Sequence, residues 1–96
     1  MSRPLLYKFR LYVADDAQNG VLAKINLAAI CRAYLPDQHE IEIVDVLVEP
    51  NRALKDGIFM TPTLIKLAPS PVRRIVGTLS QTEVVLQAIG LEAVPV

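Results

Sequence analysis

The order of apolar and polar residues in the first half of the chain predicts a strand, a helix and a second strand. Residues 7–13 alternate with period two, which is typical of a half-buried strand. Residues 21–35 form an alanine-rich apolar run at helical spacing, ended by Pro36. Its apolar stripe is wide, so we expect a helix covered on more than one side. Residues 40–47 begin by alternating and become almost wholly apolar, which predicts a strand entering a core covered on both faces.

The second half of the chain predicts a short helix, a hairpin and a last helix. Residues 50–57 are polar and have room for a short helix. Two short apolar runs, 63–67 and 72–77, predict strands joined by the tight connection Ala68-Pro69-Ser70-Pro71. Ser80-Gln81-Thr82-Glu83 has the form of a capping box, so we expect a helix to begin there.

This order, strand-helix-strand-helix-strand-strand-helix, predicts an α/β fold. The strand-helix-strand unit implies a parallel crossover, and the hairpin and last helix complete a small domain of two or three layers. The order is that of the thioredoxin fold. Because 96 residues leave room for one core, we expect residues 1–96 to form a single thioredoxin-like domain, with residues 92–96 frayed.

The chain is apolar and electrically neutral. Its 52% hydrophobic and 21% charged residues argue against disorder and favour a sticky surface or an oligomer. Its 10 basic and 10 acidic side chains balance, which argues against a general nucleic-acid binder. Lys8 interrupts the apolar stretch near the N-terminus, and no stretch reaches the ~20 apolar residues of a membrane-spanning helix. We therefore expect a cytoplasmic protein without a signal peptide or membrane segment.

Thiol chemistry is the first activity to consider for this order of elements. Thioredoxin-type exchange needs a low-pKa cysteine at the start of the first helix and a second cysteine two residues later. The corresponding loop is Ala14-Asp15-Asp16-Ala17-Gln18, and the single cysteine, Cys31, lies on the apolar stripe in the far half of the helix. We expect Cys31 to be an inert packing residue, and we expect no disulfide exchange and no multi-cysteine metal site.

Other polar residues have a structural explanation beside a chemical one. His39 is expected in a solvated turn, although partners from elsewhere would make it a base or a metal ligand. Asp15 and Asp16 form an acidic pair that suits a cation, but we expect them to start the helix, whose N-terminus favours negative charge. Asp45 lies in an apolar strand, where it is either a hydrogen-bonded structural residue or a contact residue.

The remaining candidate chemistry is sparse. Arg73 and Arg74 are strand neighbours that project to opposite faces, so they form no basic patch by themselves. Pro62 precedes a strand at the place where the thioredoxin fold has a ligand-facing cis-proline, and a trans proline that opens the strand explains the sequence equally well. The sequence has no phosphate-binding glycine loop, nucleophile elbow or metal-ligand cluster. We predict no catalytic residue, no cofactor and no metal site.

Five short segments follow one another at a distinctive spacing. They are Leu11-Tyr12-Val13-Ala14, Val44-Asp45-Val46-Leu47, Thr61-Pro62-Thr63-Leu64, Pro71-Val72-Arg73-Arg74-Ile75-Val76-Gly77 and Leu79-Ser80. In this order they resemble the circadian clock protein KaiB family, and the resemblance runs in register from about Tyr7 to Ile89.

The resemblance implies a small adaptor without catalysis. KaiB-like proteins bind the KaiC ring ATPase, and in full clocks they recruit KaiA and displace a thioredoxin-like sensor kinase domain. They adopt two folds, a thioredoxin-like monomer that binds KaiC and a tetramer with a different second half, which requires two packings within a few kcal/mol of each other. By resemblance we expect a KaiC-type ATPase as partner, KaiA or a sensor histidine kinase as further partners, and self-association as a dimer or tetramer.

The chain departs from the family pattern where the two folds differ. Pro69-Ser70-Pro71 replaces a run of three prolines, and a glycine of the last segment is replaced by Ala88. Because alanine favours a helix over glycine by about 1 kcal/mol, we expect the chain to lean toward the thioredoxin-like state. The candidate fold-switch determinants are Pro69, Ser70, Pro71, Gly77, Ala88 and Gly90.

Three functions follow from these observations. The first is an adaptor that binds a KaiC-type ring ATPase and modulates its clock or stress-signalling output. The second is a thioredoxin-like sensor or binding module for a histidine kinase or another partner, without redox activity, and the third is a redox or glutathione-linked enzyme. For the binding functions, the predicted contact residues lie in the loop and helix start after the first strand and at the proline-bearing edge. They are Ala14, Asp15, Asn19, Thr61, Pro62 and Thr63.

Overall fold

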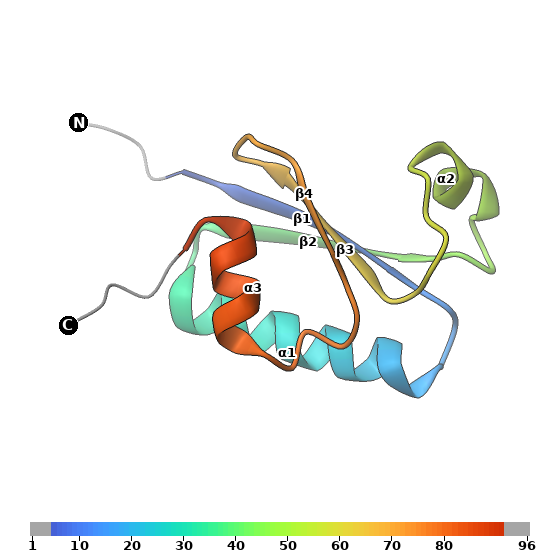
Figure 1. Ribbon diagram of the computed structural model, residues 1–96, viewed down its shortest axis with the longest axis horizontal. Helices are drawn as coiled ribbons and strands as arrows, with labels where there is room; N and C mark the ends of the chain where they lie inside the picture. The colour runs from blue at the N-terminus through green and yellow to red at the C-terminus, as the bar shows by residue number, and fades with distance from the viewer. Residues whose placement is uncertain (1–4, 92–96) are drawn as a thin grey trace.

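A four-stranded sheet forms the centre of the computed structural model, which describes residues 5–91 (Figure 1). Its strands lie in the order β2-β1-β3-β4; β2 runs parallel to β1, and β3 runs antiparallel to both β1 and β4. The strands are β1 (Tyr7–Val13), β2 (His39–Asp45), β3 (Thr63–Ala68) and β4 (Arg73–Val76). The helices are α1 (Gln18–Tyr34), α2 (Pro50–Lys55) and α3 (Thr82–Ile89). The predicted order of elements, parallel crossover and hairpin are confirmed, whereas residues 92–96 lie outside the described part.

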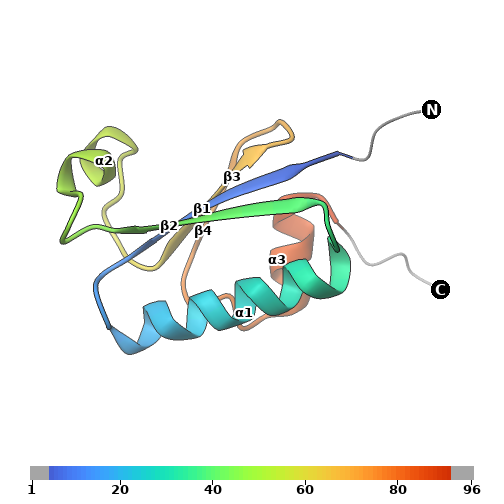
Figure 2. The same cartoon turned by 180° about the vertical axis from the view of Figure 1, so that it is seen from behind.

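Helices α1 and α3 cover one face of the sheet, and the short helix α2 lies at one end of the other face (Figures 1 and 2). The alternation in β1 explains this division. Phe9 and Leu11 project into the main core with side chains of α1 and α3, whereas Tyr12 projects into a smaller cluster with Val44 and with Ala53 of α2. The uneven cover leaves part of the second face open.

Helix α1 differs from its prediction in two ways. It begins at Gln18, one turn earlier than expected, and its first turn holds no acidic residue, because Asp15 and Asp16 lie in the preceding turn. Gly20 permits this early start, since a Cβ there would lie 3.1 Å from the Cβ of Val13. The helix is also covered on one side only, so the expectation of cover on more than one side is wrong for the single chain.

Strand β2 ends two residues before its predicted end. The Asp45 carboxylate accepts the backbone N–H of Leu47 at 2.9 Å and that of Asp15 at 3.1 Å, which turns the chain out of the sheet. Leu47 and Val48 therefore stand 68% and 73% exposed, and the expected core on both faces at this point is wrong. Of the two alternatives predicted for Asp45, the structure shows the hydrogen-bonded structural residue.

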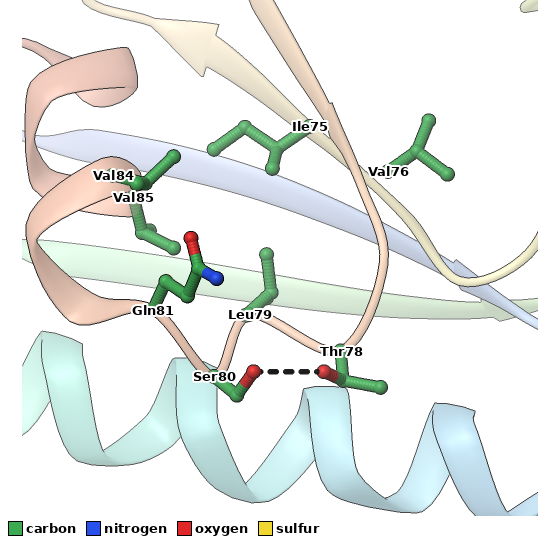
Figure 3. A pocket seen from close by; sticks show the side chains of 8 residues that line it. All are labelled: Ile75, Val76, Thr78, Leu79, Ser80, Gln81, Val84 and Val85. Atoms are coloured by element: carbon green, nitrogen blue, oxygen red, sulfur yellow. Dashed lines mark hydrogen bonds between the residues drawn. The ribbon is translucent and has the colours of Figure 1, made fainter.

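The connection from β4 to α3 is also different from its prediction. Helix α3 begins at Thr82 without a side-chain cap, so the expected capping box is absent. The Ser80 hydroxyl instead accepts a hydrogen bond from the Thr78 hydroxyl at 3.2 Å. Buried Leu79 takes a left-handed backbone conformation, φ 62°, which places its side chain in the main core and delays the helix. A cavity of about 290 Å³ lies between this connection, β4 and α3 (Figure 3).

Three peptide bonds before proline are cis: Thr61–Pro62, Ala68–Pro69 and Ser70–Pro71. The sequence left the isomer of Pro62 open, and the structure has the cis form. Across residues 5–91, none of the helices combines the length and the apolar character needed to cross a membrane.

Candidate functional site

A cavity of about 290 Å³ lies between the start of α1 and the loop that enters β3. Its lining residues are Ala14, Ala17, Gln18, Asn19, Gly20, Thr61 and Pro62. Four of the six residues predicted to contact a partner are among them, drawn from two segments more than forty positions apart in the sequence. The parallel pairing of β1 and β2 and the antiparallel return of β3 bring these segments to one end of the sheet.

The other two predicted residues lie beside the cavity rather than in its wall. Asp15 occupies the adjoining turn with φ 50°, and its backbone N–H is bound by Asp45, while its side chain is exposed. Thr63 is buried at the start of β3, and its hydroxyl donates to the Met60 carbonyl. Thr63 therefore shapes the loop and does not present its side chain.

The cavity walls carry amide, hydroxyl and aliphatic groups and no group that titrates near neutral pH. Cys31 lies elsewhere in α1, fully buried, and burial raises the pKa of its thiol to about 11. A thiol with that pKa is almost entirely protonated at neutral pH, so the prediction of a packing residue is confirmed.

His39 was expected in a solvated turn, and that expectation is wrong. His39 is the first residue of β2, and its Nδ1 lies 2.7 Å from the Leu35 carbonyl oxygen, so the ring fastens the strand to the end of α1. Within the described ranges, no three histidine, cysteine, aspartate or glutamate side chains gather in a way that could hold a metal ion.

The segment around α2 exposes five large apolar side chains that the sequence did not assign to a surface. We call Leu47, Val48, Leu54, Phe59 and Met60 the apolar α2 surface; their exposed fractions run from 62% to 93%, with Phe59 the highest. The available signal was the apolar end of the predicted strand, Val46-Leu47, which we assigned to a buried strand. Only the turn made by Asp45 shows that this run leaves the sheet.

Two residues of the apolar α2 surface, Phe59 and Met60, lie beside the cavity. A smaller hollow of about 200 Å³ is lined by Val46, Ala53, Ile58, Phe59, Met60 and Thr61. Thr61 also lines the cavity beside α1, so the two hollows share a wall. Together they form one continuous candidate binding site at the end of the sheet.

Ion pairs hold α2 in place on the open face. The Glu42 carboxylate accepts from Arg10 Nε and from Arg52 Nη2, each at 2.8 Å, and Arg10 also donates to Asp56 at 3.0 Å. The Tyr12 hydroxyl donates to Asp56 and lies 3.2 Å from the Arg52 carbonyl. The hydrogen bonds from Arg52 and Arg10 lower the pKa of Glu42 to about 2, and the Tyr12 hydroxyl and Arg10 lower that of Asp56. These ion pairs and hydrogen bonds therefore hold α2 in a fixed position on the sheet.

The two neighbouring arginines of β4 project to opposite faces, as predicted. Arg74 reaches the Gly57 carbonyl on the α2 side at 3.3 Å. On the other side Lys66 is buried, its ammonium donating to the Ile89 carbonyl at the end of α3 at 3.3 Å, and burial followed by the charge of Arg73 lowers its pKa. Lys66 was not predicted as a buried residue, because a single lysine in an apolar strand does not indicate that a helix end lies beneath it.

The candidate fold-switch determinants lie in three parts of the fold, and one of them, Gly77, donates its backbone N–H to the carbonyl of Pro62, a cavity residue, at 2.9 Å. Pro69, Ser70 and Pro71 form the turn between β3 and β4, and Gly77, with φ 120°, ends β4. Ala88 lies within α3, and Gly90 closes that helix in the left-handed conformation. The cavity of Figure 3 lies between the end of β4 and the start of α3, and Thr78, Ser80 and Gln81 form its polar wall.

Comparison with known proteins identifies relatives over nearly the whole chain. The KaiB domain family matches residues 10–91. The circadian clock protein KaiB3 of Synechocystis is 45% identical over 86 residues, which cover 90% of this chain and 82% of that protein. The circadian clock oscillator protein KaiB of Synechococcus elongatus is 42% identical over 92 residues, which cover 96% of this chain and 88% of that protein. None of these names carries an enzyme activity.

Solved structures support the fold. Mitochondrial thioredoxin 3 of Saccharomyces cerevisiae superposes with a TM-score of 0.71 at 16% identity, over 91% of this chain and 80% of the thioredoxin. The N-terminal domain of Synechococcus elongatus SasA gives 0.70 at 16% identity, over 100% of this chain and 93% of that domain. The domain is thioredoxin-like without a thiol at the start of α1, and the chain belongs to the KaiB family.

Proposed function

We propose that this chain is a non-catalytic cytoplasmic adaptor that binds a KaiC-type ring ATPase and modulates its clock or stress-signalling output. Membership of the KaiB family supports the class of partner. The observation that carries the proposal is the apolar α2 surface, where Phe59 is 93% exposed and Leu54 is 74% exposed. Burying one such side chain contributes about 1.5–3 kcal/mol, and aromatic side chains are frequent hot spots of interfaces.

The support beneath this surface suits it for binding. Glu42 and Asp56 receive hydrogen bonds from Arg10, Arg52 and Tyr12, which fix α2 to the sheet before any partner arrives. A surface already held in its binding conformation loses less entropy on association than a flexible one. The cavity with Asn19 and Pro62 adjoins it and offers amide and carbonyl groups for the rim of the interface.

KaiA or a sensor histidine kinase would be further partners of such an adaptor. The competing proposal is a binding module for a histidine kinase or another partner, again without redox activity. The two proposals differ in one respect: the adaptor binds the ATPase ring in at least one nucleotide state, and the competing module binds the ring in none of them.

We also propose that the second half of the chain can refold, and that this chain favours the thioredoxin-like state. Residues 82–89 form helix α3, and Ala88 stands in that helix where the family pattern has a glycine. Alanine stabilises the helical state by about 1 kcal/mol relative to glycine, which is a large bias when two packings are nearly equal in free energy. Solution NMR of the wild type and of Ala88→Gly would measure the populations of the two folds. The same ratio of the two folds in both proteins would contradict the proposal.

The binding proposal is tested by titrating the chain against the KaiC-type hexamer from the same organism with ATP present. We expect Phe59→Ser to weaken binding about tenfold or more, because it removes the most exposed apolar side chain of the surface. The matched control is Val72→Ser, which changes a 57% exposed apolar residue in the turn before β4, at the other end of the sheet. Equal affinity of wild type and Phe59→Ser would contradict the assignment of this surface, and equal losses in the two variants would show a nonspecific effect.

A further inference from the structure

A groove of about 340 Å³ lies between the end of α1 and the start of β2. Its lining residues are Ala28, Arg32, Pro36, Asp37, His39 and Ile41. Parallel pairing sets Tyr7 opposite His39 and Val13 opposite Asp45, so the groove lies at the other end of the sheet from the candidate binding site (Figures 1 and 2). It shares no lining residue with the cavity beside Pro62 or with the apolar α2 surface.

Two charges of opposite sign line the groove without pairing. Arg32 lies in the last turn of α1, Asp37 lies in the turn before β2, and both residues are exposed. Among residues 5–91 neither of them forms an ion pair, with the other or with a third group. Glu40 lies between His39 and Ile41 on β2, so it projects to the opposite face of the sheet. The groove therefore offers one cation and one anion to an occupant.

His39 adds a hydrogen-bonding group of defined orientation. Its Nδ1 lies 2.7 Å from the Leu35 carbonyl oxygen, and because a carbonyl oxygen only accepts, Nδ1 carries the proton of the neutral ring. Nε2 of the neutral ring is then an acceptor, and it has no partner within the described ranges. A donor group of an occupant would satisfy it.

Apolar side chains make up the rest of the groove. They belong to Ala28, Pro36 and Ile41, and Ile41 packs against the main core beneath. Such a surface gains stability when an aliphatic or aromatic group covers it. The groove thus combines an apolar wall with a cation, an anion and an acceptor.

We propose that this groove binds a free α-amino acid with an apolar side chain, such as leucine or phenylalanine. Its carboxylate accepts hydrogen bonds from the Arg32 guanidinium, which suits that planar group. Its ammonium donates to the Asp37 carboxylate and to His39 Nε2, close to the end of α1, where the helix dipole also favours positive charge. Its side chain covers the apolar wall. The volume of about 340 Å³ is at the lower end of the ~300–1,000 Å³ of small-molecule sites, which suits a ligand of this size.

Ligands with a single charge match the groove less well. A carboxylate without an ammonium would pair with Arg32 and be repelled by Asp37, and an amine without a carboxylate would meet the reverse arrangement. A zwitterion matches both charges and leaves the groove neutral. The apolar wall favours leucine over glycine by the area that the side chain buries.

The proposal does not rest on binding to an ATPase, since the groove and the proposed ring-binding surface lie at opposite ends of the sheet. Four of the six lining residues are exposed, so the groove is open to solvent. For a small ligand in an open groove we expect a dissociation constant on the order of 1 mM.

The first test is an NMR titration of the isotope-labelled chain with leucine and with phenylalanine. We expect saturable shifts of the amide signals of the lining residues and their sequence neighbours. Isocaproate lacks the ammonium of leucine, isoamylamine lacks its carboxylate, and glycine lacks its side chain; we expect each to bind at least tenfold more weakly than leucine. The absence of a saturable shift with either amino acid would overturn the proposal. Equal affinity for leucine and isocaproate would show an anion site and overturn the assignment of the ligand.

The second test repeats the leucine titration with charge variants. We expect Arg32→Gln and Asp37→Asn each to weaken binding at least tenfold, and asparagine tolerates the left-handed conformation of Asp37, φ 59°. The matched controls are Lys24→Gln in α1 and Asp16→Asn in the turn before it, which make the same changes of charge outside the groove. Unchanged affinity in the groove variants, or equal losses in the controls, would overturn the proposal.

Discussion

Glu42 is the direct probe of the contacts that hold α2 and its apolar surface on the sheet. The perturbation is Glu42→Gln, which removes the negative charge between Arg10 and Arg52 and keeps the size of the side chain. Each arginine nitrogen lies 2.8 Å from the same carboxylate oxygen, so both ion pairs are lost together.

The size of the effect follows from the exposure of the pair. The Glu42 side chain is 47% exposed and those of Arg10 and Arg52 are 24% and 34% exposed, so solvent screens the attraction. Measured ion pairs in such settings contribute about 0.5 kcal/mol each, and the two together give about 1 kcal/mol of unfolding free energy. Screening by solvent keeps the contribution of these half-exposed pairs small.

The effect depends on pH with a definite sign. The pKa of Glu42 is lowered from 4.5 to about 2 in the folded chain, so its stabilisation is fully present above about pH 4.5 and is lost as the pH falls through about 2. Glu42→Gln lacks this dependence. The difference between the two proteins should therefore be largest near neutral pH and shrink below pH 4.5.

The assay is urea unfolding at pH 7 and at pH 3, with Glu40→Gln as the matched control. Glu40 lies two residues earlier on β2, on the same face of the sheet, and among residues 5–91 it forms no ion pair. We expect Glu42→Gln to lose about 1 kcal/mol more than Glu40→Gln at pH 7, and to bind the ATPase ring more weakly. Equal losses in the two variants, or a loss that persists undiminished at pH 3, would refute the role assigned to the ion pairs.

Three further predictions concern α3, β3 and α1. Ala88→Gly should lower the unfolding free energy by about 1 kcal/mol through helix propensity, and Gly90→Ala by a similar amount because Gly90 has φ 87°; urea titration measures both. Burial lowers the pKa of Lys66 in the folded chain, so the stability of the wild type should rise as the pH approaches 10.5, where the unfolded chain still holds this proton; Lys66→Met should lack this rise. Cys31 should not react with a thiol reagent at pH 8 until urea unfolds the chain, and rapid labelling of the native protein would contradict its burial.

The fold was predictable because the patterns that define it are local. Alternation in residues 7–13, the alanine-rich run ended by Pro36 and the proline-bearing turn near residue 70 each fix one element by backbone sterics and burial. The residues near Asn19 and Pro62 also came together as expected, since the order of elements places both segments at one end of the sheet.

The other features of the fold depended on tertiary contacts, which the order of apolar and polar residues does not specify. Asp45 ends β2 only because the amides of Asp15 and Leu47 are within reach, and that turn exposes the apolar residues that follow. Likewise, Leu79 has a left-handed backbone conformation, φ 62°, and α3 begins only at Thr82, although Ser80-Gln81-Thr82-Glu83 has the form of a capping box. The wide apolar stripe of α1 predicted a second covering layer, and the single chain has none on the outer face.

Binding to a KaiC-type ring can be measured by size-exclusion chromatography of the wild-type chain mixed with the KaiC-type hexamer of its own organism, with and without ATP. We expect the wild-type chain to co-elute with the hexamer in at least one nucleotide state, and we expect the Phe59→Ser variant to elute separately. Separate elution of the wild type under every nucleotide condition would contradict the adaptor function and favour a binding module for another partner.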